Sequence, residues 1–134
     1  GMSYTTFQYD NMGATPRLAW NGKSPLFGVT VDVSVQNTGT RAGAEVVEVY
    51  VHENKPKIDR PERELKAFQR VDLQPGETKW AHFRLDRSAF SYWDPATRSW
   101  TTDPGEYEIQ IGSSSSDIRQ RKVINIPATF LRAR

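Results

Sequence analysis

Alternation of apolar and polar residues with a period of two is the sequence feature that most constrains the fold. In FGVTVDVSVQN at positions 27–37, phenylalanine and valine occupy every second position, separated by glycine, threonine, aspartate and serine. The same alternation recurs at 44–53 (AEVVEVYVHE), 79–86 (KWAHFRLD) and 105–112 (GEYEIQIG), and more weakly at 122–126 (KVINI). This period is typical of strands with one buried and one solvent-facing side. The chain is therefore expected to fold mainly as β-sheet.

Turn-forming residues separate these runs and set their connections. Asn37-Thr38-Gly39, Pro75-Gly76 and Pro104-Gly105 are suited to tight or left-handed turns. No stretch shows a 3.6-residue apolar stripe with caps, and only DRSAFSYW at 86–93 is expected to form a single helical turn. Parallel strands covered on both sides would read as continuous apolar runs, which are lacking here. The sequence therefore predicts an all-β fold, an antiparallel β-sandwich of about seven strands.

Length and composition exclude several classes of protein. A chain of 134 residues is expected to form one domain. Its 18 basic and 16 acidic residues are interspersed, so we expect no nucleic-acid partner. No apolar run approaches the roughly 20 residues that span a bilayer, so no membrane partner is expected either. The lack of cysteine excludes disulfides, thiolate catalysis and zinc–cysteine sites.

One stretch breaks the strand pattern and is a candidate for partner contacts. ENKPKIDRPERELKAFQR at 53–70 inserts about ten polar, proline-containing residues between two strands, more than a tight hairpin needs. Within it, Glu62 and Glu64 lie beside Arg60 and Arg63. A glycosidase needs two carboxyl groups across a sugar pocket. We interpret this cluster instead as solvated surface ion pairs.

Other arrangements of catalytic or metal-binding residues are no better supported. Ser113–Ser116 lack the G-x-S-x-G elbow of a serine hydrolase. His52 and His82 lie at outward positions of the strand patterns, where an exposed histidine is the default. His52 with Glu53 and Asp59 lacks the spacing of a metal site. We therefore predict that this chain contains no catalytic residue, no cofactor site and no metal site.

Trp80 is the aromatic residue with the clearest binding potential. It projects from the predicted outward face of its strand together with His82 and Arg84. An exposed tryptophan can stack on a sugar ring or anchor a protein interface. It can equally be covered by a terminal strand or a loop of the same chain. The sequence leaves these alternatives open.

The order of motifs resembles a known family. The chain contains, in order, GMSYTTFQY, VTVDVSVQNTGTRAGAEVVEVYV, RPERELKAFQRVDLQPGET, FRLDRSAFSYWD and PGEYEIQIGSSSSDIR. This order resembles the fibronectin type III-like domain that ends many glycoside hydrolase family 3 enzymes, which are β-glucosidases, β-xylosidases and relatives. The resemblance extends from Ser3 to about Ile126 and leaves out ATPRLAWNGKSP and PATFLRAR. It implies a fibronectin type III- or immunoglobulin-like sandwich formed by residues 1–134, with a core over about 3–126.

The resemblance also has implications for function. In the family, catalysis uses an aspartate in an amino-terminal barrel and an acid/base residue from the barrel or the following domain. Neither region is present here, so the resemblance implies a non-catalytic module excised from a larger retaining glycosidase. A stretch like GMSYTTF follows the α/β sandwich domain of such enzymes. The usual substrates of the family favour the periplasm or the cell exterior, although no signal peptide lies in this segment.

Two roles for such a module can be distinguished. It can dock on the catalytic domains of the same polypeptide and stabilise them through the entering strand and the loop; the interface residues would be Tyr4, Phe7, Lys57, Ile58, Arg60, Pro61, Arg63 and Leu65. In some members a loop of this module reaches towards the substrate cleft, which would make Lys57, Arg60 and Arg63 candidates for a distal sugar subsite. The alternative is an independent carbohydrate- or protein-binding module, in which an oligo- or polysaccharide or another protein contacts Trp80, His82 and Arg84.

Overall fold

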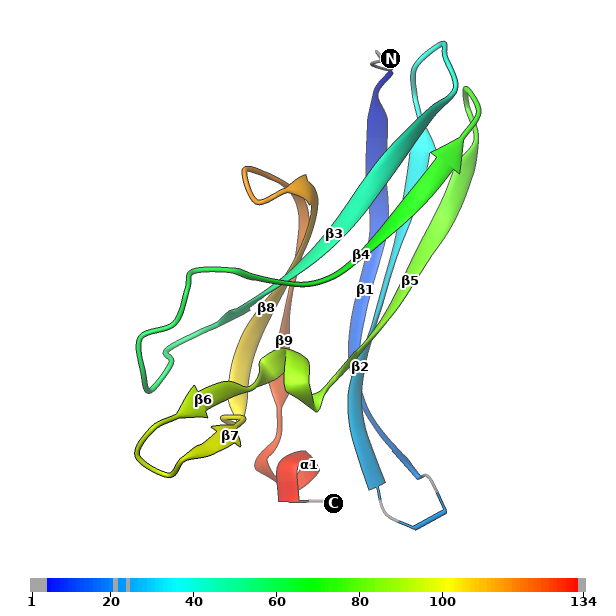
Figure 1. Cartoon of the computed structure of the whole chain (residues 1–134). Coiled ribbons are helices and arrows are strands. Elements are labelled where there is room, and N and C mark those ends of the chain that lie inside the picture. The colour runs from blue at the N-terminus through cyan, green and yellow to red at the C-terminus, as the bar shows by residue number, and fades with distance from the viewer. Residues whose placement is uncertain (1–4, 21, 24, 133–134) are drawn as a thin grey trace.

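The structure is a computed structural model that describes residues 5–20, 22–23 and 25–132 (Figure 1). Nine strands are present in the described part of the chain. They are β1 (Phe7–Trp20), β2 (Pro25–Asn37), β3 (Gly43–Glu53), β4 (Glu64–Leu73), β5 (Thr78–Asp86), β6 (Tyr92–Asp94), β7 (Ser99–Thr101), β8 (Gly105–Ser114) and β9 (Asp117–Ile126). A 3-10 turn, η1 (Arg87–Phe90), follows β5, and a short helix, α1 (Ala128–Arg132), follows β9.

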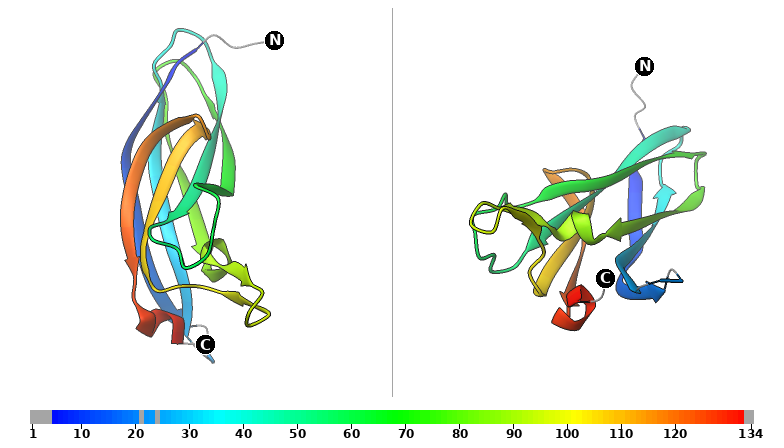
Figure 2. Two further views of the ribbon diagram at one scale, coloured as in Figure 1. Left: turned by 90° about the vertical axis from the view of Figure 1, so that its left-hand side faces the viewer. Right: turned by 60° about the horizontal axis from the view of Figure 1, so that its bottom comes forward.

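Seven of these strands form two facing antiparallel sheets (Figures 1 and 2). One sheet has the strand order β1-β2-β5, and the other has the order β4-β3-β8-β9. Strands β6 and β7 form a separate hairpin that projects from one end of the sandwich (Figure 1). The predicted antiparallel β-sandwich of about seven strands is thus confirmed, and the hairpin is a separate two-stranded sheet.

The alternating residues form the core between the sheets. Val29, Val31, Val33 and Val35 of β2 are fully buried. The facing sheet contributes apolar side chains of β3 and β8 to the same cluster, and Phe90 of η1 joins it. Full burial of a valine-sized side chain contributes about 1.5–3 kcal/mol relative to exposure, so this alternation is the main reason why the two sheets stack.

Two buried residues, Asn37 and Tyr107, use their polar atoms to hold neighbouring segments of the chain. The Asn37 amide donates to the carbonyl oxygens of Arg41 and Leu73 at 2.8 and 3.1 Å, and its oxygen accepts from Thr5 Oγ1 and the Gly39 amide at 2.6 and 2.9 Å. These bonds fix the turn between β2 and β3. Tyr107 has its hydroxyl 2.7 Å from the Asp103 carbonyl oxygen. A buried tyrosine that bonds back to the chain before its strand resembles the tyrosine corner of immunoglobulin-type sandwiches.

Two segments differ from the sequence-based expectation. Strand β1 is long, and its second half, from Gly13 to Trp20, pairs with β2. Pro16 is tolerated there because β1 is an edge strand of its sheet. Leu131 of α1 is buried against the core beyond the expected limit at about Ile126. The expected single helical turn is present as η1.

Candidate functional site

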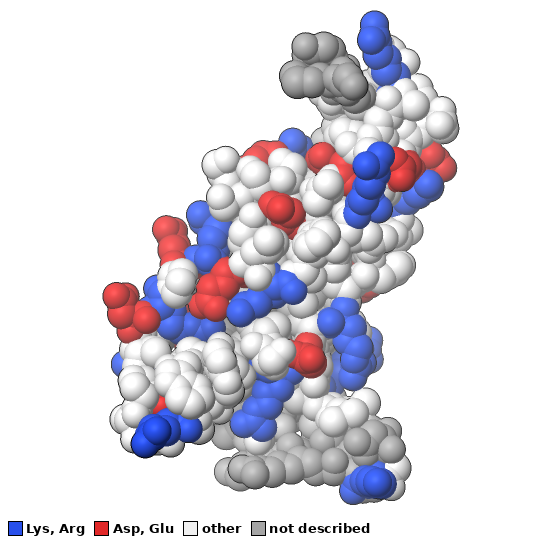
Figure 3. Space-filling view, in the orientation of Figure 1, with Lys and Arg blue, Asp and Glu red and all other residues white. Residues whose placement is uncertain are grey.

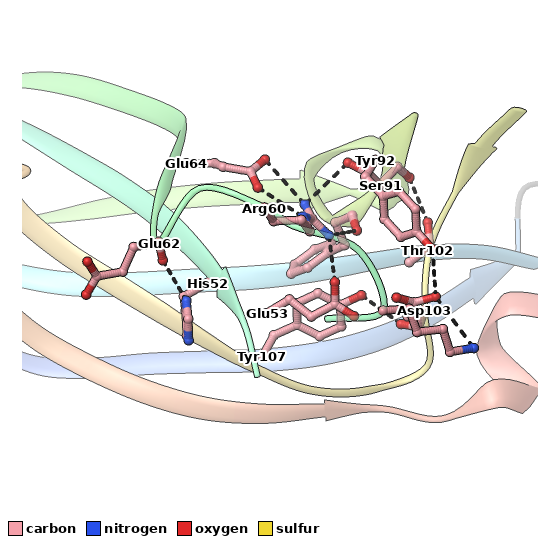
Figure 4. A network of polar contacts seen from close by, with 12 residues as sticks. His52, Glu53, Arg60, Glu62, Glu64, Ser91, Tyr92, Thr102, Asp103 and Tyr107 are labelled. Atoms are coloured by element: carbon pink, nitrogen blue, oxygen red, sulfur yellow. Dashed lines mark hydrogen bonds and ion pairs between the residues drawn. The ribbon is translucent and has the colours of Figure 1, made fainter. Parts of the chain in front are cut away.

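The loop between β3 and β4 is held by a buried arginine (Figure 4). The side chain of Arg60 is only 5% exposed. Its Nη1 donates to Glu53 Oε1 at 2.8 Å, and its Nε donates to Glu64 Oε2 at 3.0 Å. The same guanidinium donates to the carbonyl oxygens of Phe90 and Ser91 at 3.2 and 3.4 Å. One side chain thus ties the loop to the end of β3, the start of β4 and the chain after η1.

The interpretation of this cluster as solvated ion pairs was wrong for Arg60 and Glu64. Their side chains are 5% and 21% exposed, whereas Glu62 is 79% exposed and only 3.7 Å from Arg63 Nη2. The difference arises because the loop folds back over η1, where two carbonyl oxygens require donors. The planar fork of an arginine can satisfy several oxygens at once, and a surface position would not need this.

The carboxyl groups of Glu53 and Asp103 form a pair beside Arg60. Glu53 is buried, and this burial together with a hydrogen bond to Asp103 raises its pKa to about 7, while Arg60 opposes the shift. Asp103 Oδ1 accepts from the Tyr92 hydroxyl at 3.3 Å and lies 3.9 Å from Lys57 Nζ. Asp103 Oδ2 is buried without a hydrogen-bond partner among the described residues. The carboxyl groups of Glu53 and Asp103 thus form a buried acidic pair, of which Glu53 is bonded to Arg60.

An apolar groove opens above this buried cluster, between the loop and the β6–β7 hairpin. Its volume is about 620 Å³, which is within the usual range of ligand pockets. Trp93 and Trp100 pair across the hairpin, with ring centroids 5.6 Å apart and an interplanar angle of 70°. Ile58 and Pro61 line the groove from the loop. Figure 3 shows a largely uncharged surface over this hairpin, at the lower left of the molecule.

The pairing of Trp93 with Trp100 was not predicted from the sequence. The available signal was the Asp94-Pro95 turn between the two tryptophans, because a hairpin closed there places them opposite each other. Phe68 was also missed. It is 70% exposed on β4, the strand that also carries Leu65, which is 48% exposed.

The structure places the expected interface residues in different environments. Lys57 is exposed at the loop, whereas Arg63 is partly buried and donates to Gln110 Oε1 at 2.9 Å. Phe7 packs partly against the core of this chain, so only part of its ring is available to a partner. Tyr4 lies outside the described residues. Ile58, Pro61 and Leu65 remain as the apolar side chains of the loop and the start of β4.

The Trp80 face lies on the other sheet. Trp80 is 49% exposed on β5, and His82 and Arg84 share its outward face. The indole stacks near the His82 ring at a centroid distance of 6.3 Å, and His82 Nδ1 is 2.6 Å from Asp32 Oδ1. In the described part of the chain, no strand or loop buries Trp80.

The described residues contain no cluster of three or more histidine, aspartate or glutamate side chains suited to a metal ion. The Ser113 hydroxyl bonds to Asp117, whereas His52 bonds to the Glu62 carbonyl oxygen and His82 to Asp32. The serine and the histidines therefore do not form a triad. No helix in the described ranges is long and apolar enough to cross a membrane.

Comparisons with known proteins place the chain in a family. The model of the fibronectin type III-like domain matches residues 45–115, just over half of the chain. Thermostable β-glucosidase B of Acetivibrio thermocellus is 37% identical over 129 residues, a match that covers 96% of this chain and 17% of the relative. The exo-α-(1→6)-L-arabinopyranosidase of Bifidobacterium breve is 38% identical, with 90% of this chain and 15% of the relative covered.

Solved structures give the same result. The GH3 β-glucosidase of Bifidobacterium adolescentis superposes with a TM-score of 0.81 at 35% identity, covering 94% of this chain and 18% of that one. A β-glucosidase of Chaetomella raphigera superposes with a TM-score of 0.83 at 32% identity, covering 94% and 19%. The chain thus spans less than a fifth of each of these proteins. It belongs to the fibronectin type III-like domains and is an accessory domain of the kind carried by β-glucosidases of glycoside hydrolase family 3.

Proposed function

We propose that this chain is the non-catalytic, carboxyl-terminal module of a family 3 glycoside hydrolase and that it docks on the catalytic domains of the same polypeptide. The parent would be a retaining β-glucosidase or a related exo-acting glycosidase, as the names of the relatives suggest. The observation that carries the proposal is an exposed apolar surface on a rigid support. Leu65 and Phe68 project from β4 beside a loop that Arg60 holds from within.

The rigidity of this loop favours docking. An interface that must order a flexible loop loses part of its binding free energy to conformational entropy. The loop between β3 and β4 is already fixed by the ion pairs of Arg60 with Glu53 and Glu64. Its exposed residues can therefore contact the catalytic domains without further ordering, and the contact would hold those domains in register.

The loop also limits which cations can contact a distal sugar subsite. Lys57 extends into solvent with its side chain 75% exposed, and its ammonium makes only a long ion pair of 3.9 Å with Asp103. Arg63 is partly used by Gln110 and by the Ser115 carbonyl oxygen. Arg60 is enclosed by its own chain, which makes it a support for the loop rather than a direct sugar contact. Of the three candidates, Lys57 is the strongest.

The docking proposal is tested in the full-length enzyme with Leu65→Asp. A charge placed in an apolar interface should lower the melting temperature of the full-length protein by several degrees, because a buried unpaired charge is strongly unfavourable. Val123→Asp is the matched control, since Val123 is 56% exposed on β9 at the opposite edge of the same sheet. An unchanged melting temperature for Leu65→Asp, or an equal fall for both variants, would refute docking through this surface.

Direct saccharide or partner binding through Trp80 is the second candidate role. The half-exposed indole beside His82 supports it, but the match to one fixed part of much longer enzymes does not favour an independent binding module. If it operates, Trp80→Ala should abolish retention of the domain on insoluble polysaccharide. Retention that survives the substitution, or that the unmodified domain lacks, would exclude it.

A further inference from the structure

The polar atoms at the floor of the groove are already engaged within the chain. Arg60 bonds to two carboxylates and two carbonyl oxygens. Glu64 accepts from Arg60 and lies 3.1 Å from Lys66 Nζ. Ser91 Oγ is bonded to the Arg87 carbonyl oxygen and to the Thr102 hydroxyl. A saccharide presents many hydroxyl groups that need partners in its site, and this floor offers few.

The walls of the groove are instead suited to an apolar protein surface. Trp100 is 71% exposed and Trp93 is 48% exposed. Ile58 and Pro61 line the groove from the loop. Tryptophan is enriched at the centres of protein interfaces, where an anchor side chain fills a pocket and water is excluded. Trp100 and Ile58 therefore provide the apolar contacts of such a pocket.

Asp59, at the rim of the groove, adds a negative charge to this apolar surface. Asp59 lines the groove and is exposed, and no hydrogen bond or ion pair engages its carboxylate among the described residues. An acidic group next to an apolar pocket favours a partner that places a lysine or arginine beside its apolar side chain, because complementary charges fix the register of an interface.

The length of the relatives favours a partner that belongs to the same polypeptide as this chain. The chain makes up less than a fifth of the β-glucosidases it matches, so most of such a polypeptide lies outside it. Domains joined in one polypeptide meet at a high effective concentration, which favours contact even through a modest surface. A groove in an accessory domain is therefore more readily filled from its own polypeptide than by a separate protein.

We propose that in the full-length enzyme the groove between the β3–β4 loop and the β6–β7 hairpin receives an apolar side chain of the preceding catalytic domains, which is held between Trp100 and Ile58, with a basic residue facing Asp59. This inference rests on the proposed docking function and extends the interface from β4 to the hairpin. It also implies that the Trp80 face, on the other sheet, stays open to solvent in the enzyme.

Hydroxyl-radical footprinting with mass spectrometry tests this directly, because it measures the oxidation of each tryptophan in the unmodified protein. We expect Trp100 to be oxidised at least about fivefold more slowly in the full-length enzyme than in the 134-residue chain, as an anchor residue is largely desolvated. Trp80 serves as the internal control, and its oxidation rate should be the same in both samples. Equal rates for Trp100 in the two samples, or equal protection of both tryptophans, would overturn the proposal.

Two further measurements distinguish a failure of the groove proposal from a failure of the docking proposal. If Leu65→Asp destabilises the full-length enzyme while Trp100 remains unprotected, docking occurs but the groove is not part of it. If neither effect is seen, docking itself fails. Cellobiose added to the 134-residue chain tests a saccharide as the occupant: we expect no protection of Trp100, and protection would overturn the assignment of a protein partner.

Discussion

The groove and the outer face of the three-stranded sheet both expose tryptophan, yet they differ in what lies beneath it. Trp80 lies on a strand beside His82, and the histidine is itself paired with Asp32. Trp100 projects beside a hollow whose floor is a buried ion cluster centred on Arg60. Both tryptophans adjoin a hollow, of about 620 Å³ at Trp100 and about 440 Å³ at Trp80. The ion pair that lines the hollow at Trp80, between His82 and Asp32, is exposed, whereas the guanidinium of Arg60 is buried. A buried ion cluster beneath the hollow, rather than an exposed tryptophan or a hollow alone, therefore distinguishes the groove as the candidate interface.

Among the substitutions that test this difference, loss of Arg60 should lower the free energy of unfolding the most. Arg60→Met leaves the buried carboxyl group of Glu53 and two carbonyl oxygens without their donor and removes one cation from the partly buried Glu64, so the free energy of unfolding of the chain should fall by about 3–5 kcal/mol. Arg70→Met is the control, because Arg70 pairs with Asp72 at the surface and should contribute less than about 1 kcal/mol. Urea denaturation measures both. A loss below about 1 kcal/mol for Arg60→Met would show that the cluster does not stabilise the groove floor.

Glu53 should make the stability of the groove region depend on pH. Its pKa is raised from 4.5 to about 7 in the folded chain, so between these values the folded state keeps a proton that the unfolded state releases. Stability should therefore fall as pH rises through this window, by a change on the order of 2 kcal/mol. Glu53→Gln should remove this slope, whereas Glu62→Gln, at an exposed position, should retain it. Urea denaturation at pH 5 and pH 8 measures the slope, and a slope that persists in Glu53→Gln would assign it to another group.

Removal of single exposed tryptophans should have the smallest effect. In the 134-residue chain, Trp80→Ala should cost about 0.5 kcal/mol or less, as surface substitutions usually do. Trp100→Ala should cost about 1 kcal/mol, because it also removes the edge-to-face contact with Trp93. Thermal unfolding of the chain and of the full-length enzyme measures both effects. If Trp100→Ala costs no more in the full-length enzyme than in the isolated chain, the two tryptophan surfaces are equivalent after all.

The sheets could be predicted from the sequence because their residues alternate. The valines of β2 and the isoleucines of β8 are buried at every second position, and the pattern alone indicates which side of the strand faces the core. The Asn37 turn was predicted because its residue types favour a tight turn. The length of β1 was not predicted, since Pro16 argues against a strand unless it is known to lie at an edge.

The groove could not be predicted because it depends on contacts between distant segments. Arg60 is buried only because its loop folds back onto the carbonyl oxygens of Phe90 and Ser91, about thirty positions further along the chain. Local sequence gives no sign of that path, and charged residues beside one another are most often solvated. The pairing of Trp93 with Trp100 likewise requires the hairpin register, which the turn residues suggest but do not specify.

The internal anchoring of the loop has a consequence for how such a domain can be adapted. The guanidinium that fixes the loop faces inward, while Lys57, Ile58, Asp59 and Pro61 face the groove or solvent. If the domain docks as proposed, support and recognition are carried by different side chains. The outward residues could then be exchanged to suit a different parent enzyme while the framework stays unchanged, much as antibody loops vary on a constant scaffold. This makes the domain a transplantable part whose fit could be redesigned at four positions.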